Sequence, residues 1–275
     1  MPKAISSFEN KKILYNHYAY YPEDKIRFGF HVHDICEVIF LKSGDTSAII
    51  GHQIYKLHKH SLIIFRANIP HKIVVEENSD YERYNLLFDE NNLANQIFHK
   101  IPDDFTLMDC SGNDYIIDLF KKYDFYCKTF QGEDLEILLT NITEELIYNI
   151  YLSASDDPEC DILSMHPLIG KAVKFINQHY AENITIDDIS SHLCITKSHL
   201  HHLFVEFMKI TPKKYITIRR LAKAQKLIRM DRKPSDVYSV CGFGDYATFY
   251  RNYILHFGYA PSEEGKIIKE RKIES

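Results

Sequence analysis

The sequence predicts an α+β protein of two domains, an N-terminal antiparallel β-barrel with following helices and a C-terminal all-α domain. Three observations predict this fold: the length of 275 residues, a change from alternating to helical periodicity along the chain, and a change in the sign of the charge. Single hydrophobic cores commonly stop growing near about 100–200 residues. A chain of this length is therefore expected to fold as two units.

The barrel is predicted by short runs of residues that alternate apolar and polar side chains between positions 26 and 88. Four of these runs cover residues 37–41, 47–50, 61–65 and 72–75. Turn signals separate them at 43–45, 51–52 and 68–70. Closely spaced strands with turns between them are typical of an antiparallel barrel or sandwich.

The period changes beyond residue 90, and the clearest helical pattern starts at Asp134. Seven apolar residues there follow the i, i+3, i+4, i+7 spacing of an amphipathic helix, namely Leu135, Leu138, Leu139, Ile142, Leu146, Ile147 and Ile150. The acidic residues of this segment lie off the apolar stripe. Two alternatives stay open for the stripe: it packs on the barrel, or it meets a second subunit.

Residues 153–159 are small and acidic and include a proline, with no periodicity across them. We therefore predict a domain at 1–155, a linker at 156–166 and a second domain at 167–275. Helix start signals follow in the second domain at Thr185, Thr196 and Ser235.

The parts of the chain before and after residue 170 carry opposite charge. Residues 1–170 contain 15 Lys and Arg against 27 Asp and Glu, a net charge of −12, whereas residues 171–275 contain 18 against 11, a net charge of +7. This asymmetry indicates that only the second domain meets a polyanion. The longest apolar runs are a few residues and the N-terminus has no secretory signal, so we expect a cytoplasmic protein without a membrane partner.

The basic domain repeats one pattern twice, at residues 186–204 and 235–253. In each segment, apolar positions recur as two helices joined by a tight turn require. Ile195 fills the first turn and Phe243 the second, where Gly242 can take a positive φ. A basic helix over 215–228 lies between them, and it would hold two recognition helices about 34 Å apart, in successive major grooves of DNA.

This domain resembles the AraC/XylS family of transcription regulators over residues 168–265. The resemblance rests on an ordered series of residues: Leu193-x-Ile195-Thr196, Leu200-x-x-Leu203-Phe204, Thr211-Pro212-x-x-Tyr215, Arg220-Leu221-x-x-Ala224-x-x-Leu227, Gly242-Phe243-x-Asp245, Phe249 and Phe257-Gly258-x-x-Pro261. The first unit departs from the family pattern at Cys194 and Lys209. The second unit departs from it at Tyr238 and Glu264, and these two departures predict looser packing there.

By position, the resemblance implies that the exposed side chains of the two recognition helices reach base edges or nearby phosphates. These are Ser198, His201 and His202 in the first helix, and Tyr246, Ala247, Tyr250 and Arg251 in the second. Arg251 has the bidentate fork that reads guanine. Phosphate contacts are expected from Lys197, Lys213, Lys214 and Arg220.

In the acidic domain, His31, His33 and Glu37, followed by Gly44 and then by His71, resemble the cupin pattern. Even steps along a strand would place the first three on one face, the barrel interior, with His71 opposite. We expect these four residues to contact a small-molecule effector.

No cofactor is expected in the acidic domain, but a divalent transition metal at the same four residues stays open as an alternative, since imidazole and carboxylate suit zinc, manganese, iron or nickel. A purely structural role stays open too. Against a metal, His60, Arg66 and Asn68 stand where metal-binding cupins often show glycine or proline.

Together these features predict a non-enzymatic, sequence-specific regulator that binds double-stranded DNA and responds to an effector, for which a sugar is one candidate. We expect a homodimer, and an activator that contacts RNA polymerase. Two alternatives remain: a metal-dependent cupin enzyme, and a constitutive DNA-binding protein whose barrel only dimerises. The sequence specifies neither the effector nor the operator.

Overall fold

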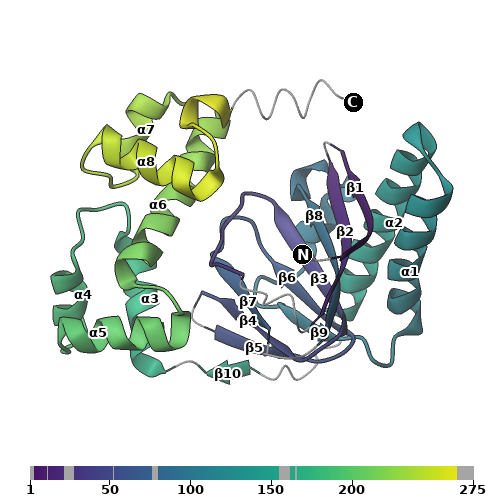
Figure 1. Cartoon of the computed structure of the whole chain (residues 1–275), viewed down its shortest axis with the longest axis horizontal. Helices are drawn as coiled ribbons and strands as arrows, with labels where there is room; N and C mark the ends of the chain where they lie inside the picture. Colours follow the sequence, from purple (N-terminus) through teal and green to yellow (C-terminus); the bar gives the residue numbers. More distant parts are fainter. Residues whose placement is uncertain are drawn as a thin grey trace.

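The computed structural model describes residues 3–10, 12–21, 28–51, 53–75, 80–154, 162–164 and 166–264. A β-sheet domain with a pair of helices on its outer side lies beside an all-helical domain (Figure 1). Within the described ranges, every helix is too short or too polar to cross a bilayer. The predicted fold class is confirmed.

The N-terminal domain contains two antiparallel sheets. The first has the strand order β1-β2-β8-β3-β6-β9 and the second the order β10-β5-β4-β7. In chain order the strands are β1 (Lys3–Glu9), β2 (Ile13–Tyr20), β3 (Cys36–Ser43), β4 (Thr46–Ile50), β5 (Gln53–Leu57), β6 (Ser61–Phe65), β7 (His71–Val75), β8 (Tyr81–Phe88), β9 (Leu107–Asp109) and β10 (Ile162–Ser164).

Neighbouring side chains of β3 face two different cores, because successive residues of a strand point to opposite faces of a sheet. Val38 and Phe40 pack with the helices that cover the first sheet. Ile39 and Leu41 pack with residues of both sheets in the barrel interior. The alternating runs in the sequence are thus confirmed as β3, β4, β6 and β7.

Helices α1 (Asp114–Thr129) and α2 (Gly132–Ser153) cover the outer face of the first sheet (Figure 1). Of the predicted apolar stripe on α2, all residues are buried except Leu138, which is partly buried. This stripe joins the core under the first sheet. The first alternative for the stripe is therefore the one observed: it packs on the barrel of its own chain.

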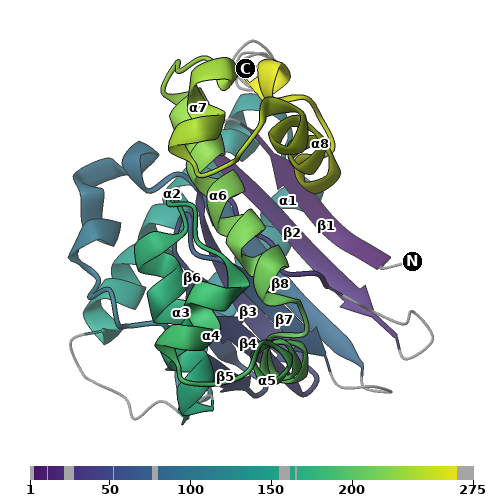
Figure 2. The same ribbon diagram turned by 90° about the vertical axis from the view of Figure 1, so that its left-hand side faces the viewer.

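The C-terminal domain contains two helical units joined by α6. Its elements are α3 (Pro167–His179), α4 (Ile186–His192), α5 (Lys197–Leu203), the π-helical turn η4 (Phe204–Met208), α6 (Pro212–Arg229), α7 (Pro234–Val240), α8 (Tyr246–Phe257) and the 3-10 turn η5 (Pro261–Glu263). Figure 2 shows α6 crossing in front of the barrel strands, with α3, α4 and α5 around one end and α7 and α8 around the other.

Each helical unit has its own core. The first is built by α3, α4, α5 and the first part of α6, and the second by the last part of α6 with α7 and α8. The 18 residues of α6 span about 27 Å at 1.5 Å per residue. The two units are therefore held apart by a single continuous helix, as the sequence predicted.

Two of the three predicted helix starts are confirmed. Thr185 and Thr196 are N-caps whose hydroxyl oxygens accept hydrogen bonds from backbone N–H groups. The third prediction is wrong: α7 begins at Pro234, and Ser235 lies within its first turn. Proline fits a first turn because its fixed φ is helical and its missing N–H would have no helical partner.

The turns within the two units need a left-handed residue. Gly242 has φ +87°, as predicted, and it fits that conformation at no steric cost. In the first unit Cys194 has φ +54° at the equivalent place, where a side chain is strained. The first unit therefore stores strain that the second avoids.

The predicted linker at 156–166 contains a strand. Residues 162–164 form β10, which pairs antiparallel with β5 through the partners Ile162 and Tyr55, Leu163 and Ile54, and Ser164 and Gln53. Residues 156–161 and 165 lie outside the described part of the chain. The connection between the domains is therefore anchored to the edge of the second sheet.

Candidate functional site

Three histidines and one glutamate come together where the segment before β3 meets the start of β7. The backbones of His31 and His71 form an isolated antiparallel bridge, with a 3.0 Å hydrogen bond in each direction. The carbonyl of His33 accepts a 2.7 Å hydrogen bond from the N–H of Asn68. Glu37 is the second residue of β3. These backbone contacts bring all four predicted residues to one place.

The predicted reason for this convergence was wrong, although the residues were right. β3 begins only at Cys36, so His31, His33 and Glu37 do not share a strand. The bridge to His71 and the contact with Asn68 hold the two histidines instead. The even spacing in the sequence therefore does not cause the common orientation.

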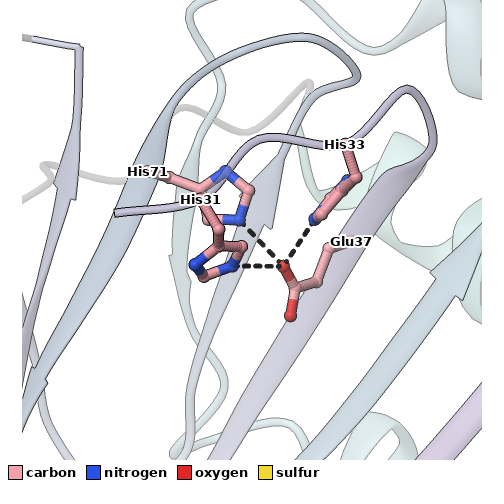
Figure 3. Close-up of side chains that lie close together, drawn as sticks. All are labelled: His31, His33, Glu37 and His71. Carbon is pink, nitrogen blue, oxygen red and sulfur yellow. Dashed lines mark hydrogen bonds and ion pairs between the residues drawn. The ribbon is translucent and has the colours of Figure 1, made fainter. Parts of the chain in front are cut away.

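One carboxylate oxygen is the centre of the cluster (Figure 3). Glu37 Oε2 lies 2.9 Å from His71 Nε2, 3.0 Å from His33 Nε2 and 3.8 Å from His31 Nε2. The side chains of Glu37 and His71 are buried, whereas that of His31 is 42% exposed. The cluster is thus a buried polar site that solvent reaches on one side.

The second nitrogen of each ring is held by the backbone. Nδ1 of His31 lies 3.1 Å from the carbonyl of Gly29, and Nδ1 of His33 lies 2.7 Å from that of Ile35. Nδ1 of His71 lies 2.8 Å from the carbonyl of Ile69. A carbonyl oxygen only accepts hydrogen bonds, so each Nδ1 carries the proton. Every ring is therefore oriented with Nε2 toward Glu37.

The electrostatics of the cluster favour an ionised Glu37. Burial acts to raise the pKa of this carboxyl, but the contacts with the three imidazoles outweigh it and hold the pKa well below its usual value. Burial lowers the pKa of His71 to about 4. The cluster therefore contains a carboxylate beside at least one neutral imidazole at neutral pH.

Two polar residues on β8, neither of which was predicted from the sequence, also face the barrel interior. In the sheet, Arg83 is paired with Leu41 and Asn85 with Ile39. Leu41 and Ile39 point into the barrel, and directly paired residues point to the same face of a sheet. In the described structure, Arg83 Nε and Asn85 Oδ1 are buried without a hydrogen-bond partner. Buried polar atoms are normally paired, which marks these two as candidate ligand contacts. Their signal in the sequence is an arginine at an inward-facing strand position.

A cavity of about 600 Å³ lies beside this region, a size typical of small-molecule sites. It is lined by Ile69, whose carbonyl holds His71, and by Ile50, which is the partner of His71 in the sheet. Tyr55 and Arg66 add polar groups to its wall. The four cluster residues do not themselves line this cavity, which adjoins the cluster only through Ile69 and Ile50.

The predicted base-reading side chains lie on the surface of the C-terminal domain. Ser198, His201 and His202 on α5 are exposed, as are Tyr246, Ala247, Tyr250 and Arg251 on α8. Among the predicted phosphate contacts, Lys197 and Lys213 are exposed, and Lys214 is partly buried. The ends of both recognition helices are thus accessible, and DNA contact by these residues stays a prediction.

Arg220 differs from this group. Its guanidinium donates hydrogen bonds to the carbonyls of Tyr180 at 2.7 Å and Glu182 at 2.9 Å. It also lies over the ring of Phe243, 5.9 Å from the centroid. Arg220 therefore links the two helical units through its side chain, and its predicted phosphate contact stays a prediction.

Glu264, one of the departures from the family pattern, is also structural. Its carboxylate is fully buried and accepts hydrogen bonds from the hydroxyl of Tyr253 and, at 2.5 Å, from Arg229 Nε. Packing around this position is thus tight, and the prediction of looser packing is wrong at Glu264. The reason is that an ion pair with α6 replaces an aromatic contact.

The C-terminal domain contacts the barrel next to the histidine cluster. Arg229 at the end of α6 forms an ion pair with Asp34, and Arg219 donates a 2.7 Å hydrogen bond to the carbonyl of Asn68. The ring of Phe30 packs edge-on against Tyr215 on α6, with centroids 6.4 Å apart. All three barrel residues are close neighbours of cluster histidines in the sequence.

A barrel with a buried polar site, joined to two helix-turn-helix units with exposed recognition helices, defines a DNA-binding protein with a ligand-binding domain. Comparison with known families agrees: residues 14–100 match the AraC-like ligand binding domain, and residues 189–266 match a helix-turn-helix domain. The chain is therefore similar to AraC-type transcription regulators in both of its domains. The predicted DNA-binding regulator with an effector domain is confirmed at this level.

The chain is similar to several characterised and uncharacterised proteins. It is 31% identical to the lactose operon transcription activator of Staphylococcus xylosus over 129 residues, 46% of each chain. It is 24% identical to the uncharacterized HTH-type transcriptional regulator YbfI of Bacillus subtilis over 230 residues, 80% of each chain. An alignment with apo ToxT from Vibrio cholerae covers 93% of this chain and 97% of that one, with 15% identity and a TM-score of 0.43.

Proposed function

We propose that this regulator binds a small polar effector at the cluster of His31, His33, Glu37 and His71, and that binding changes how the recognition helices are presented to DNA. One observation carries the proposal. The segments 30–34 and 68–71 supply three of the four cluster residues and also the contacts to α6. A ligand that moves either segment acts directly on the DNA-binding domain.

The coupling follows from differential binding. An effector shifts an equilibrium only if its binding free energy differs between two arrangements of the protein. The ion pair between Asp34 and Arg229 and the contact between Asn68 and Arg219 stabilise the arrangement described above. We infer that this is the effector-free arrangement, and that the effector favours a second one in which these contacts are altered.

For the effector itself, we propose a sugar. The similar protein of Staphylococcus xylosus is an activator of a lactose operon. The barrel interior offers hydrogen-bonding groups at Glu37, Arg83 and Asn85, beside aromatic rings such as Phe65 and Tyr81. Apolar walls with a few convergent polar groups suit such ligands.

We further propose that the protein works as a homodimer that activates transcription together with RNA polymerase, and that it has no enzymatic role. Dimerisation is supported by three apolar side chains on the outer side of α2: Ile137 is 50%, Tyr148 51% and Leu152 49% exposed. Their spacing places them along one side of the helix. Sedimentation of the protein with and without charged substitutions at Ile137 and Tyr148 would test this interface.

The coupling is tested by measuring DNA affinity with and without sugar. Genomic fragments that the purified protein selects provide the operator, and lactose with a panel of mono- and disaccharides provides the effectors. We expect the active sugar to change the affinity by about 5–150-fold in the wild type. Asp34→Asn should reduce this ratio, because it removes the ion pair with Arg229.

Asp45→Asn, in the exposed turn after β3, is the matched control and should respond like the wild type. If Asp34→Asn and the wild type respond equally to the sugar, the coupling does not pass through this contact.

A further inference from the structure

The four side chains of the cluster have the spacing of ligands around one metal ion. Their donor atoms all lie within 4.8 Å of one another, and Glu37 Oε2 is 2.9, 3.0 and 3.8 Å from the three Nε2 atoms. Two ligands bound at about 2.1 Å to one ion lie about 3.0 Å apart at a right angle and about 3.4 Å apart at the tetrahedral angle. The cluster therefore needs only small shifts to surround an ion.

The orientation of the three imidazole rings also supports a metal site. Because each Nδ1 donates to a backbone carbonyl, each neutral imidazole presents the lone pair of Nε2 to the centre of the cluster. The carboxylate of Glu37 is also only an acceptor. With all three imidazoles neutral, three lone pairs and a carboxylate would face one point, and a metal ion would supply there the positive charge that protons on Nε2 otherwise provide. A backbone carbonyl on the second ring nitrogen is also the usual arrangement of metal-binding histidines.

We propose that His31, His33, Glu37 and His71 bind one divalent transition-metal ion. The inference rests on the proposed function, since it assigns the ion to the same effector site. Three imidazoles and a carboxylate suit zinc, iron, cobalt, nickel or manganese better than magnesium or calcium, which take oxygen ligands. The exposed ring of His31 gives the ion a path from solvent, and an octahedral ion would keep two positions for oxygen atoms of an effector.

A bound ion would also fix the contact between the domains. Asp34 lies between the two proposed ligands His33 and Glu37 and directly follows His33. The next residue, Ile35, accepts the hydrogen bond from the His33 ring and directly precedes β3. Ligation of His33 and Glu37 on either side thus restrains the segment that carries Asp34. The ion pair of Asp34 with Arg229 then transmits the occupancy of the site to α6.

The test uses the full-length protein, freed of metal with a chelator and titrated with Co²⁺. We expect one Co²⁺ per chain, with visible d–d absorption bands and displacement by Zn²⁺. Glu37→Gln and His31→Ala should each weaken Co²⁺ binding by at least about tenfold. His31→Ala matters most, because its exposed ring contributes little to packing, and circular dichroism verifies that both variants are folded.

A second pair of histidines provides the matched control. His201 and His202 are exposed on α5 and could bind Co²⁺ weakly at the surface, so the double variant His201→Ala/His202→Ala should keep the tight site and its bands. Absence of stoichiometric binding by the wild type at about 100 µM Co²⁺, or equal binding by wild type and His31→Ala, would overturn the inference.

The outcome is separable from that of the proposed function. The sugar response of DNA binding is measured on the chelator-treated protein as well as on the metal-loaded one. A sugar response without Co²⁺ binding rejects the ion and keeps the effector site. Co²⁺ binding at the cluster without any sugar response supports the ion and rejects the sugar.

Discussion

Gly242 lies directly against the guanidinium of Arg220: a Cβ atom at position 242 would be 2.9 Å from Arg220 Nε and 2.8 Å from the carbonyl oxygen of Ala181. The same guanidinium binds the carbonyls of Tyr180 and Glu182. The turn of the second helix-turn-helix unit is thus packed onto the first unit through one arginine. The relative placement of the two recognition helices depends on this contact.

Gly242→Ala should destabilise the C-terminal domain. The substitution places a side chain at φ +87°, which costs about 1–2 kcal/mol, and adds a clash with backbone atoms that cannot move freely. Chemical denaturation of the two proteins measures the difference in unfolding free energy. Gly244→Ala is the control, since a Cβ there meets no atom within 4 Å, and it should be close to neutral.

Arg220→Ala should reduce stability and leave the salt dependence of DNA binding unchanged. The loss of a partly buried hydrogen bond to Tyr180 and an exposed one to Glu182 costs about 1–3 kcal/mol. Lys226→Ala, an exposed position on the same helix, should have little effect on denaturation. A lower slope of log affinity against log salt, with unchanged stability, would instead show that Arg220 contacts phosphate.

Lys213→Ala should lower the slope of log affinity against log salt by about one, because each phosphate contact releases about one counterion. The residue is exposed at the start of α6, so the fold should tolerate its loss. Lys100→Ala, an exposed change in the barrel domain, serves as the control. An unaltered slope for Lys213→Ala would remove this lysine from the DNA-binding surface.

Arg251→Ala should weaken binding to the operator by about 5–150-fold, equivalent to about 1–3 kcal/mol for a bidentate base contact. Binding to unrelated DNA should change much less. Fluorescence anisotropy on operator and scrambled duplexes measures both affinities. Equal losses on the two duplexes would assign Arg251 to the phosphate backbone.

Asp124→Asn should destabilise the barrel domain at neutral pH. Asp124 on α1 accepts hydrogen bonds from Tyr15 at 2.8 Å and from Ser6, and its second oxygen lies 2.8 Å from His17 Nδ1. Burial acts to raise the pKa of Asp124, but these contacts outweigh it and hold the pKa below the ordinary value of 3.8.

The stabilisation from Asp124 is therefore complete above that ordinary value and is lost as the pH falls through the lower pKa of the folded state. We expect a loss of about 1–3 kcal/mol for Asp124→Asn at pH 7, shrinking toward zero in acid. Asp118→Asn, on the exposed side of α1, is the control and should show little pH-dependent difference. A constant difference at all pH values would contradict the assignment.

Several elements were predictable because their patterns are local. The run 61–65 is β6, and the apolar stripe from Leu135 to Ile150 is the buried side of α2. β8 is harder to recognise, because Arg83 and Asn85 occupy buried positions where the pattern expects apolar residues. β2 has a similar interruption, since the buried His17 is paired with Asp124 and Glu82.

The candidate site was predictable only in part, because some of the residues that contact each other there are far apart in the sequence. Four residues with metal-type side chains were visible by their chemistry. The contacts through which the site is proposed to act join residues that are remote in the sequence: Asp34 pairs with Arg229, and Asn68 with Arg219. Such pairs are set by the packing of two domains, for which a single sequence has no local pattern.

The short strand β10 limits how far the DNA-binding domain can travel. Ser164 is paired to Gln53 at the sheet edge and α3 begins at Pro167, so three peptide units, about 11 Å when extended, connect the two. While β10 stays in place, the DNA-reading module cannot leave the barrel and can only swivel about this short tether. The proposed response to an effector is therefore expected to be a change of angle between two modules that stay tethered to each other.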